Sequence, residues 1–69
     1  MDMKLIPSTV VEALGRGGAQ EFDDLLKQVQ KYQSDINETE FVKILMDMEI
    51  QGLIRVSRMA KGKRRIELA

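Results

Sequence analysis

The chain has 69 residues with no cysteine and no histidine, and its eleven basic residues balance its eleven acidic ones. This length allows one small domain, which buries only about 60% of its unfolded surface. The composition excludes disulfides and thiolate metal sites, and it removes the commonest metal ligand and general base. The core therefore has to come from packed aliphatic side chains, with or without the support of a second subunit.

The balanced total conceals an uneven distribution of charge. Up to Gly52 there are five Lys/Arg and ten Asp/Glu, a net charge of −5, whereas residues 53–69 carry six Lys/Arg and one Glu, a net charge of +5. A polyanion is attracted to one pole and repelled by the other over a Debye length of about 8–10 Å. This polarity favours contact between the C-terminal end and a nucleic acid.

No long apolar run follows the N-terminal residues. The longest apolar stretches fall short of the roughly 18 residues of a membrane span and the roughly 7–15 of a signal-peptide core. We therefore expect a cytoplasmic protein without membrane contact, and the opening methionine is typical of a natural start.

The first helix is predicted at about residues 8–15. Pro7 is tolerated in a first helical turn, Ser8 is a good N-cap, and the glycine-rich run 15–18 ends the helix. Three aliphatic residues are expected to face the core: Val10, Val11 and Leu14. Residues 19–22 are too short to predict as an independent element, but they suit one extended edge segment.

The second helix is predicted at about residues 24–32. Either Asp23 or Asp24 is expected to cap it, and residues 33–35 are typical of a turn. Apolar residues recur at three- and four-residue spacing and predict one inward stripe: Leu25, Leu26, Val29 and Tyr32.

The third helix has the clearest boundaries and is predicted at about residues 38–51. The Asn37 side chain can cap free amides, and Glu40 three residues later completes a capping box. Two flanking apolar residues occupy the positions of a hydrophobic staple: Ile36 and Phe41. Gly52 supplies a left-handed stop.

The remaining residues predict a β-hairpin. Residues 53–58 and 64–68 are rich in branched side chains and partly alternate apolar with polar, which is typical of strands. The stretch Lys61-Gly62-Lys63 between them predicts a basic turn. The expected order is helix, short extended piece, helix, helix and hairpin.

The end of the third helix carries a family resemblance. From Leu45 to Ile54 the pattern is Leu-x-x-Met-Glu-x-x-Gly-Leu-Ile, which is similar to the end of the recognition helix in many winged helix-turn-helix proteins. The resemblance covers Ile6 to Leu68. It implies one α+β domain over residues 1–69, with three helices and a two-stranded hairpin wing. Proteins of this fold include transcription regulators, parts of replication and transcription machinery, and protein-interaction modules, so the fold alone does not choose a function.

In this family the outward face of the third helix usually enters the DNA major groove. Steps of 100° per residue predict a core face of Phe41, Ile44, Leu45 and Met48, with Val42 at its margin. The opposite face is predicted to hold Thr39, Lys43, Met46, Asp47 and Ile50, with Glu40 beside them.

This opposite face is poorly suited to reading bases, because its middle lacks Arg, Asn and Gln, and acidic residues oppose DNA contact. Thr39 and Lys43 are its candidate DNA-binding residues. Met46 and Ile50 are four residues apart on one stripe. They are either ordinary exposed aliphatic residues or a surface for a protein partner or a homodimer.

Six basic residues of the predicted hairpin are the main DNA-binding candidates: Arg55, Arg58, Lys61, Lys63, Arg64 and Arg65. The resemblance implies that a wing touches the minor groove or the phosphate backbone, with salt-sensitive and sequence-independent contacts. The alternative is an ordinary solvated edge, whose charges keep it from pairing with other chains. Stacking of bases is not expected, because there are only three aromatic residues.

No set of residues predicts catalysis, since the serines have no histidine to activate them. We expect no cofactor, no metal and no small-molecule substrate. The leading hypothesis is a small transcription regulator or DNA-packaging protein, dimeric, that binds double-stranded DNA. The alternative is a protein-interaction winged helix within a larger transcription, replication or other assembly, which uses Met46 and Ile50.

Overall fold

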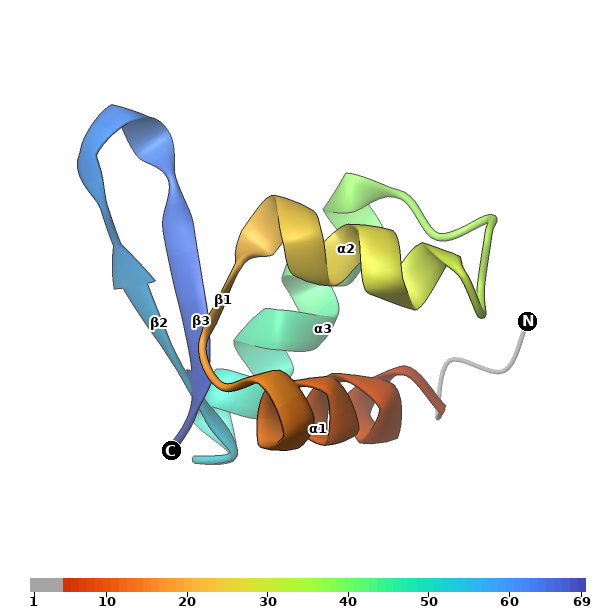
Figure 1. Cartoon of the computed structure of the whole chain (residues 1–69), viewed down its shortest axis with the longest axis horizontal. Coiled ribbons are helices and arrows are strands. Elements are labelled where there is room, and N and C mark those ends of the chain that lie inside the picture. The colour runs from red at the N-terminus through yellow and green to blue at the C-terminus, as the bar shows by residue number, and fades with distance from the viewer. Residues whose placement is uncertain (1–4) are drawn as a thin grey trace.

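The computed structural model describes residues 5–69, which form three helices and a small antiparallel sheet (Figure 1). The elements are α1 (Leu5–Gly17), β1 (Gln20–Glu21), α2 (Phe22–Gln30), α3 (Glu38–Ile50), β2 (Ile54–Arg58), a 3-10 turn (Ala60–Gly62) and β3 (Arg64–Leu68). The predicted α+β class and the predicted order of elements are confirmed. The short segment at residues 20–21 is a strand, so the sheet has three strands rather than two.

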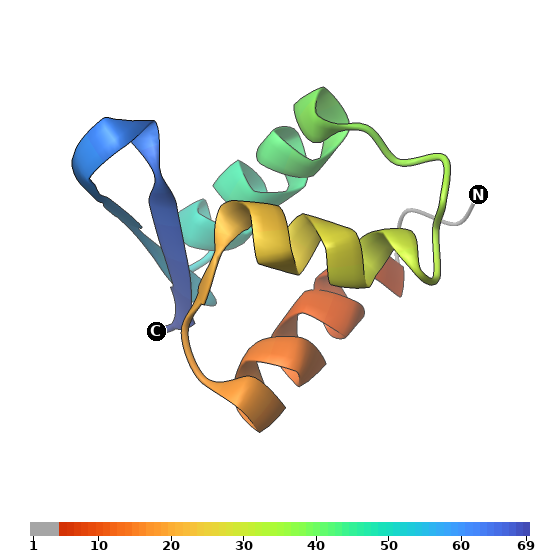
Figure 2. The same ribbon diagram turned by 45° about the horizontal axis from the view of Figure 1, so that its top comes forward.

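The sheet has the order β1-β3-β2, and both pairings are antiparallel. Ile66 on the central strand lies opposite Val56 on one side and Gln20 on the other. Its side chain is fully buried. The hairpin of β2 and β3 stands at one end of the helical layer, and its turn projects away from the helices (Figures 1 and 2).

The core lies where the three helices meet the sheet. Its buried side chains are aliphatic or aromatic: Ile6, Val10, Ala13, Leu14, Phe22, Leu25, Val29, Ile36, Phe41, Leu45, Met48, Ile54 and Ile66. Within residues 5–69 no polar or charged residue is buried. The core therefore needs no internal ion pair, which agrees with the aliphatic core expected from composition.

Two residues predicted to face inward are exposed. Val11 is 38% exposed, because the buried stripe of α1 follows Ile6, Val10 and Leu14, and Val11 lies 100° further round. Tyr32 is 71% exposed, because α2 ends at Gln30 and the chain has left the helical stripe before it reaches Tyr32.

The starts of the first two helices differ from the prediction. α1 begins three residues earlier, at Leu5, so Ser8 lies inside the helix and does not cap it. Pro7 is accommodated because amides of the first turn have no partner within the helix. α2 begins at Phe22 after Glu21, whose side chain makes no capping hydrogen bond. The predicted capping role of Asp23 or Asp24 is therefore wrong.

Both ends of α3 agree with the prediction. The Glu40 amide donates to Asn37 Oδ1 at 2.8 Å, and the Asn37 amide donates to Glu40 Oε1 at 3.4 Å, which completes the capping box. At the C-terminal end Gly52 has φ +78°. The amides of Gly52 and Leu53 donate to the carbonyls of Glu49 and Met48, both at 3.0 Å. These two bonds form a Schellman motif, which sets the direction in which the chain enters β2.

In the part of the chain that the structure describes, no helix combines the length and the apolar character needed to cross a bilayer.

Candidate nucleic-acid interface

The candidate interface is the basic hairpin, by which we mean β2, β3 and the turn between them. The turn is closed by the Met59 amide, which donates to the Lys63 carbonyl at 2.7 Å. Lys61 and Gly62 both have positive φ, of 64° and 74°. This left-handed pair reverses the chain and leaves the Lys61 side chain exposed in the turn.

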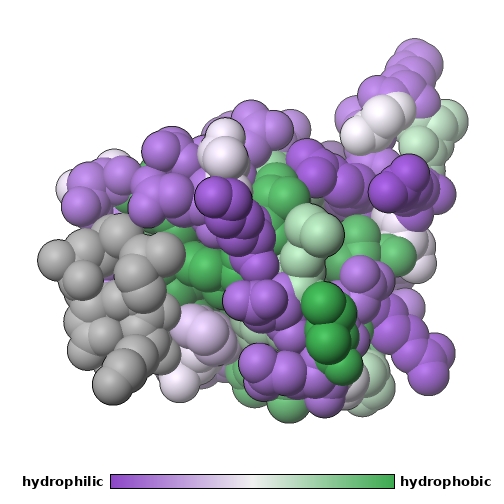
Figure 3. Space-filling model, turned by 180° about the vertical axis from the view of Figure 1, so that it is seen from behind, coloured by the Kyte–Doolittle hydropathy of each residue, from purple (hydrophilic) through white to green (hydrophobic). Residues whose placement is uncertain are grey.

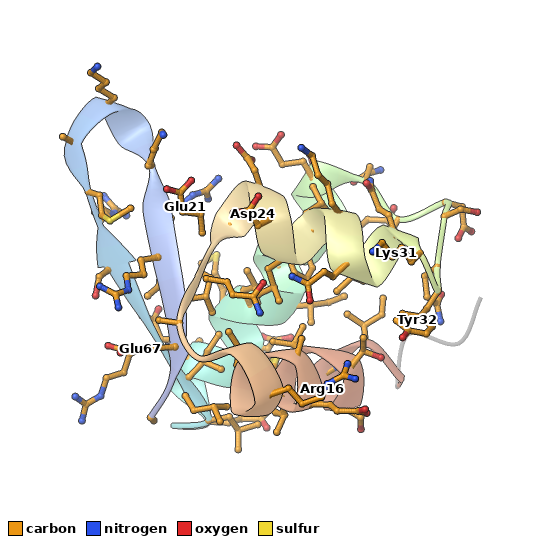
Figure 4. All side chains as sticks on the ribbon, viewed as in Figure 1. Arg16, Glu21, Asp24, Lys31, Tyr32 and Glu67 are labelled. Carbon is orange, nitrogen blue, oxygen red and sulfur yellow. The ribbon has the colours of Figure 1, made fainter. Side chains whose placement is uncertain are left out.

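The strand register divides the basic residues between two faces, because residues directly opposite each other in an antiparallel pair share a face. Arg58 lies opposite Arg64, two positions beyond the pair of half-buried Val56 and buried Ile66, so Arg58 and Arg64 are on the helix-facing side. Arg55 lies opposite Glu67, and Arg65 lies opposite Ser57 on the outer face. Figure 4 shows Glu67 pointing away from the helices.

Arg64 is attached to the helical body. Its guanidinium Cζ lies 4.0 Å from the centroid of the Phe22 ring, and its Nη2 lies 3.7 Å from Glu38 Oε1. The Phe22 ring in turn packs against the Phe41 ring, with centroids 5.4 Å apart. Arg64 therefore joins β3 to the starts of α2 and α3, and its charge is partly compensated there.

Lys63 has a weaker internal partner. Its Nζ lies 4.0 Å from Glu21 Oε2, and both side chains are about half exposed. Figure 4 shows Glu21 between the hairpin and the start of α2. An exposed ion pair at this distance contributes little to stability and exchanges readily with solvent or with another anion.

The other four basic residues of the hairpin are exposed and, within residues 5–69, have no carboxylate oxygen within 4.0 Å: Arg55, Arg58, Lys61 and Arg65. The sequence pattern alone predicts all six as one group. The structure separates these four from Lys63 and Arg64, whose partners Glu21 and Glu38 are distant in sequence.

The outward face of α3 differs from the hairpin in charge and in polarity. The helix carries four acidic residues and only Lys43 as a base, so its net charge is −3. Thr39 and Lys43 are exposed as predicted, and Met46 and Ile50 are 55% and 81% exposed. Figure 3 views the molecule from behind, where α3 lies, and shows apolar side chains among polar ones.

Two grooves border α3, and neither was predicted from the sequence. One, of about 190 Å³, lies between α3 and the basic hairpin, with Val42, Met46 and Val56 among its lining residues. The other, of about 550 Å³, lies between α3 and the start of α1 and is lined in part by Pro7 and Ile44. The sequence places Val42 at the margin of the core face of α3, and this position is its one indication of the groove beside the basic hairpin.

Comparisons with models of known protein families, with curated proteins and with solved structures found no match for this chain. Among residues 5–69, no three acidic side chains gather closely enough to hold a metal ion. Charge, exposure and geometry are therefore the grounds on which a function can be proposed.

Proposed function

We propose that this chain is a winged-helix domain that binds duplex DNA through the phosphate backbone, with the basic hairpin as its wing. The order of elements supports the winged-helix assignment, because a short β1 after α1 pairs with the return strand of a hairpin that follows α3. The Schellman motif at Gly52 supports it too, since it lies in the pattern that carries the family resemblance.

The observation that carries the proposed function is the set of four exposed hairpin cations without internal ion pairs among the described residues: Arg55, Arg58, Lys61 and Arg65. Three of them can be approached by a duplex from outside the acidic helical body, namely Arg55 and Arg65 on the outer face and Lys61 in the turn, whereas Arg58 lies on the helix-facing side. Three phosphate contacts give a salt slope of about −2.7, at about 0.9 for each phosphate.

In this mode of binding α3 stays out of the major groove. Its net charge of −3 opposes the phosphates. Its outward apolar side chains, Met46 and Ile50, could contact only thymine methyl groups among the base edges of the major groove. Binding is then insensitive to base sequence, which suits DNA packaging or broad regulation of transcription.

The test is a duplex-binding titration by fluorescence anisotropy over a series of salt concentrations. The double variant K61E/R65E is expected to lose binding. A matched control, K27E/K31E, makes the same change in net charge at two exposed lysines, one within α2 and one directly after it. Lys63 and Arg64 are left unchanged, because replacing Arg64 also removes its contact with Phe22.

Retention of DNA by the wild type and by the control, with loss in K61E/R65E, supports the proposal. A wild type that fails to bind duplex DNA at low salt overturns it, and so does equal loss in both double variants.

A second candidate function is a protein-interaction winged helix in a larger assembly. The exposure of Met46 and Ile50 on one stripe of α3 favours it. Under this alternative, I50D abolishes capture of the partner, whereas K61E/R65E leaves it intact.

A further inference from the structure

An exposed apolar seam runs along the outward face of α3. Its apolar residues are Met46 and Ile50, which are 55% and 81% exposed, and the exposed polar residues Thr39 and Lys43 precede them on the same face. Leu53, 43% exposed, follows just beyond the end of the helix and lines the other groove, between α3 and the start of α1. The spacing of Met46 and Ile50, four residues apart, is typical of a helix face that packs against another apolar surface.

Beside the seam, the groove between α3 and the basic hairpin has walls of opposite charge. Glu49 of α3 lies on one wall and Arg58 of β2 on the other, with Val42, Met46 and Val56 between them. Glu49 and Arg58 are both exposed, and no ion pair joins either of them to another described residue. An occupant of this surface therefore needs an apolar centre flanked by a basic and an acidic side.

We propose that the occupant is a second copy of this chain. A two-fold axis that lies in the contact plane, parallel to α3, brings the acidic wall of each copy onto the basic wall of the other. The wall that carries Glu49 in each copy then faces the wall that carries Arg58 and Arg64 in the other, and the two apolar centres meet. The chain is neutral overall with poles of −5 and +5, so two copies attract each other in this orientation.

The size of a stable interface indicates how much of this surface has to be covered. A specific interface buries about 800 Å² per partner, which is about one sixth of the 4747 Å² exposed by this chain. The groove, of about 190 Å³, is too small to supply this area alone. The contact therefore has to continue along α3 to Ile50.

This inference does not rest on DNA binding. The outer-face cations Arg55 and Arg65 and the turn residue Lys61 lie outside the proposed contact. A dimer leaves them accessible and doubles the number of hairpins that one particle presents. Self-association can therefore be measured without nucleic acid, and either proposal can fail while the other stands.

The experiment is sedimentation equilibrium of the chain alone at concentrations up to about 1 mM. The wild type is expected to dimerise and I50D to be monomeric. Y32D is the matched control, since Tyr32 is exposed in the turn after α2, away from the hairpin (Figure 4). It is expected to dimerise like the wild type, and circular dichroism checks that each variant is folded.

A charge exchange tests the two-fold arrangement. Each of E49R and R58E is expected to raise the dimer dissociation constant at least about tenfold, and E49R/R58E is expected to restore it. Loss in both single variants with recovery in the double variant supports the proposal. A wild type that is monomeric at about 1 mM overturns the proposal, and the partner of this surface is then a different protein. A dimer that I50D leaves intact, or a double variant without recovery, overturns it as well.

Discussion

The guanidinium of Arg64 lies 4.0 Å from the centroid of the Phe22 ring, so the return strand of the hairpin is attached to the first residue of α2. A planar cation stacked on an aromatic face combines electrostatic attraction with burial of its apolar surface. The second contact of Arg64, with Glu38, is to a side chain that is 68% exposed. The aromatic contact is therefore the larger contribution to holding the hairpin against the helices.

Replacing Arg64 by alanine is expected to lower the free energy of unfolding by about 1–2 kcal/mol. R64K keeps the charge but loses the planar stacking, so we expect about half of that loss. Urea denaturation followed by circular dichroism measures both. R65A is the control, because Arg65 is exposed on the opposite face, and its effect is expected to stay within about 0.5 kcal/mol. An R64A protein as stable as R65A would contradict this account.

The capping box at the start of α3 gives a second prediction. N37A removes the acceptor of the Glu40 amide and is expected to cost about 1 kcal/mol of unfolding free energy. N37D keeps an acceptor at the same place and is expected to retain wild-type stability. The comparison uses denaturant midpoints at constant m-value. If N37A and N37D were equally stable, the hydrogen bond at 2.8 Å would have no stabilising role.

Two glycines predict opposite effects of the same substitution. Gly52 has φ +78° with open space around the missing Cβ, so G52A introduces backbone strain of about 1–2 kcal/mol and no clash. Gly15 lies inside α1 with open space around it and no positive φ. G15A is therefore expected to stabilise the protein by about 0.5–1 kcal/mol. Thermal unfolding of the two variants checks the sign, and a stabilising G52A would contradict the left-handed conformation.

The loss of one methylene group from the central strand is expected to lower the free energy of unfolding. Ile66 is fully buried, so I66V is expected to cost about 0.5–1.5 kcal/mol. Valine is preferred to alanine, because a larger loss would consume much of the roughly 5–15 kcal/mol that such a domain has. I50V is the matched control, because it removes the same methylene from a side chain that is 81% exposed. A cost for I50V above that for I66V would contradict the placement of the core.

DNA binding through the hairpin predicts a contrast between two lysines. K61A is expected to reduce the magnitude of the salt slope by about 0.9 on every duplex sequence, because it removes one phosphate contact. K43A on α3 is expected to leave the slope and the affinity unchanged, because α3 stays out of the groove. Titrations of both variants on two duplexes of unrelated sequence test this. A larger effect for K43A would place α3 in the groove.

The sequence predicts an element well where the signal is local. Asn37 and Glu40, three residues apart, define the start of α3, and Gly52 defines its end. The prediction of 38–51 therefore differs from the observed Glu38–Ile50 by one residue. The start of α1 was missed by three residues, because Ile6 is drawn into a core that forms only in the tertiary structure. Tyr32 was misplaced for a related reason, since the end of α2 has no local stop signal.

The sequence predicts which basic residues belong to the candidate site, but it does not predict their contacts. The charge of this site could be counted along the chain, and the alternation of the strands indicated two faces. The attachment of Arg64 to Phe22 and Glu38 could not be predicted, because it depends on how β3 packs against helices more than twenty residues away in sequence. The groove beside α3 likewise exists only once the hairpin has folded back beside Val42 and Met46.

Glu21 ends β1 and Phe22 begins α2 with no residue between them, and β1 pairs with β3. A rotation of the hairpin therefore cannot be absorbed by a loop before it reaches α2. A displacement of the hairpin is therefore transmitted to the first turn of this helix, so the hairpin and α2 are expected to move together. A ligand that immobilises the turn should accordingly slow amide hydrogen exchange in the first turn of α2.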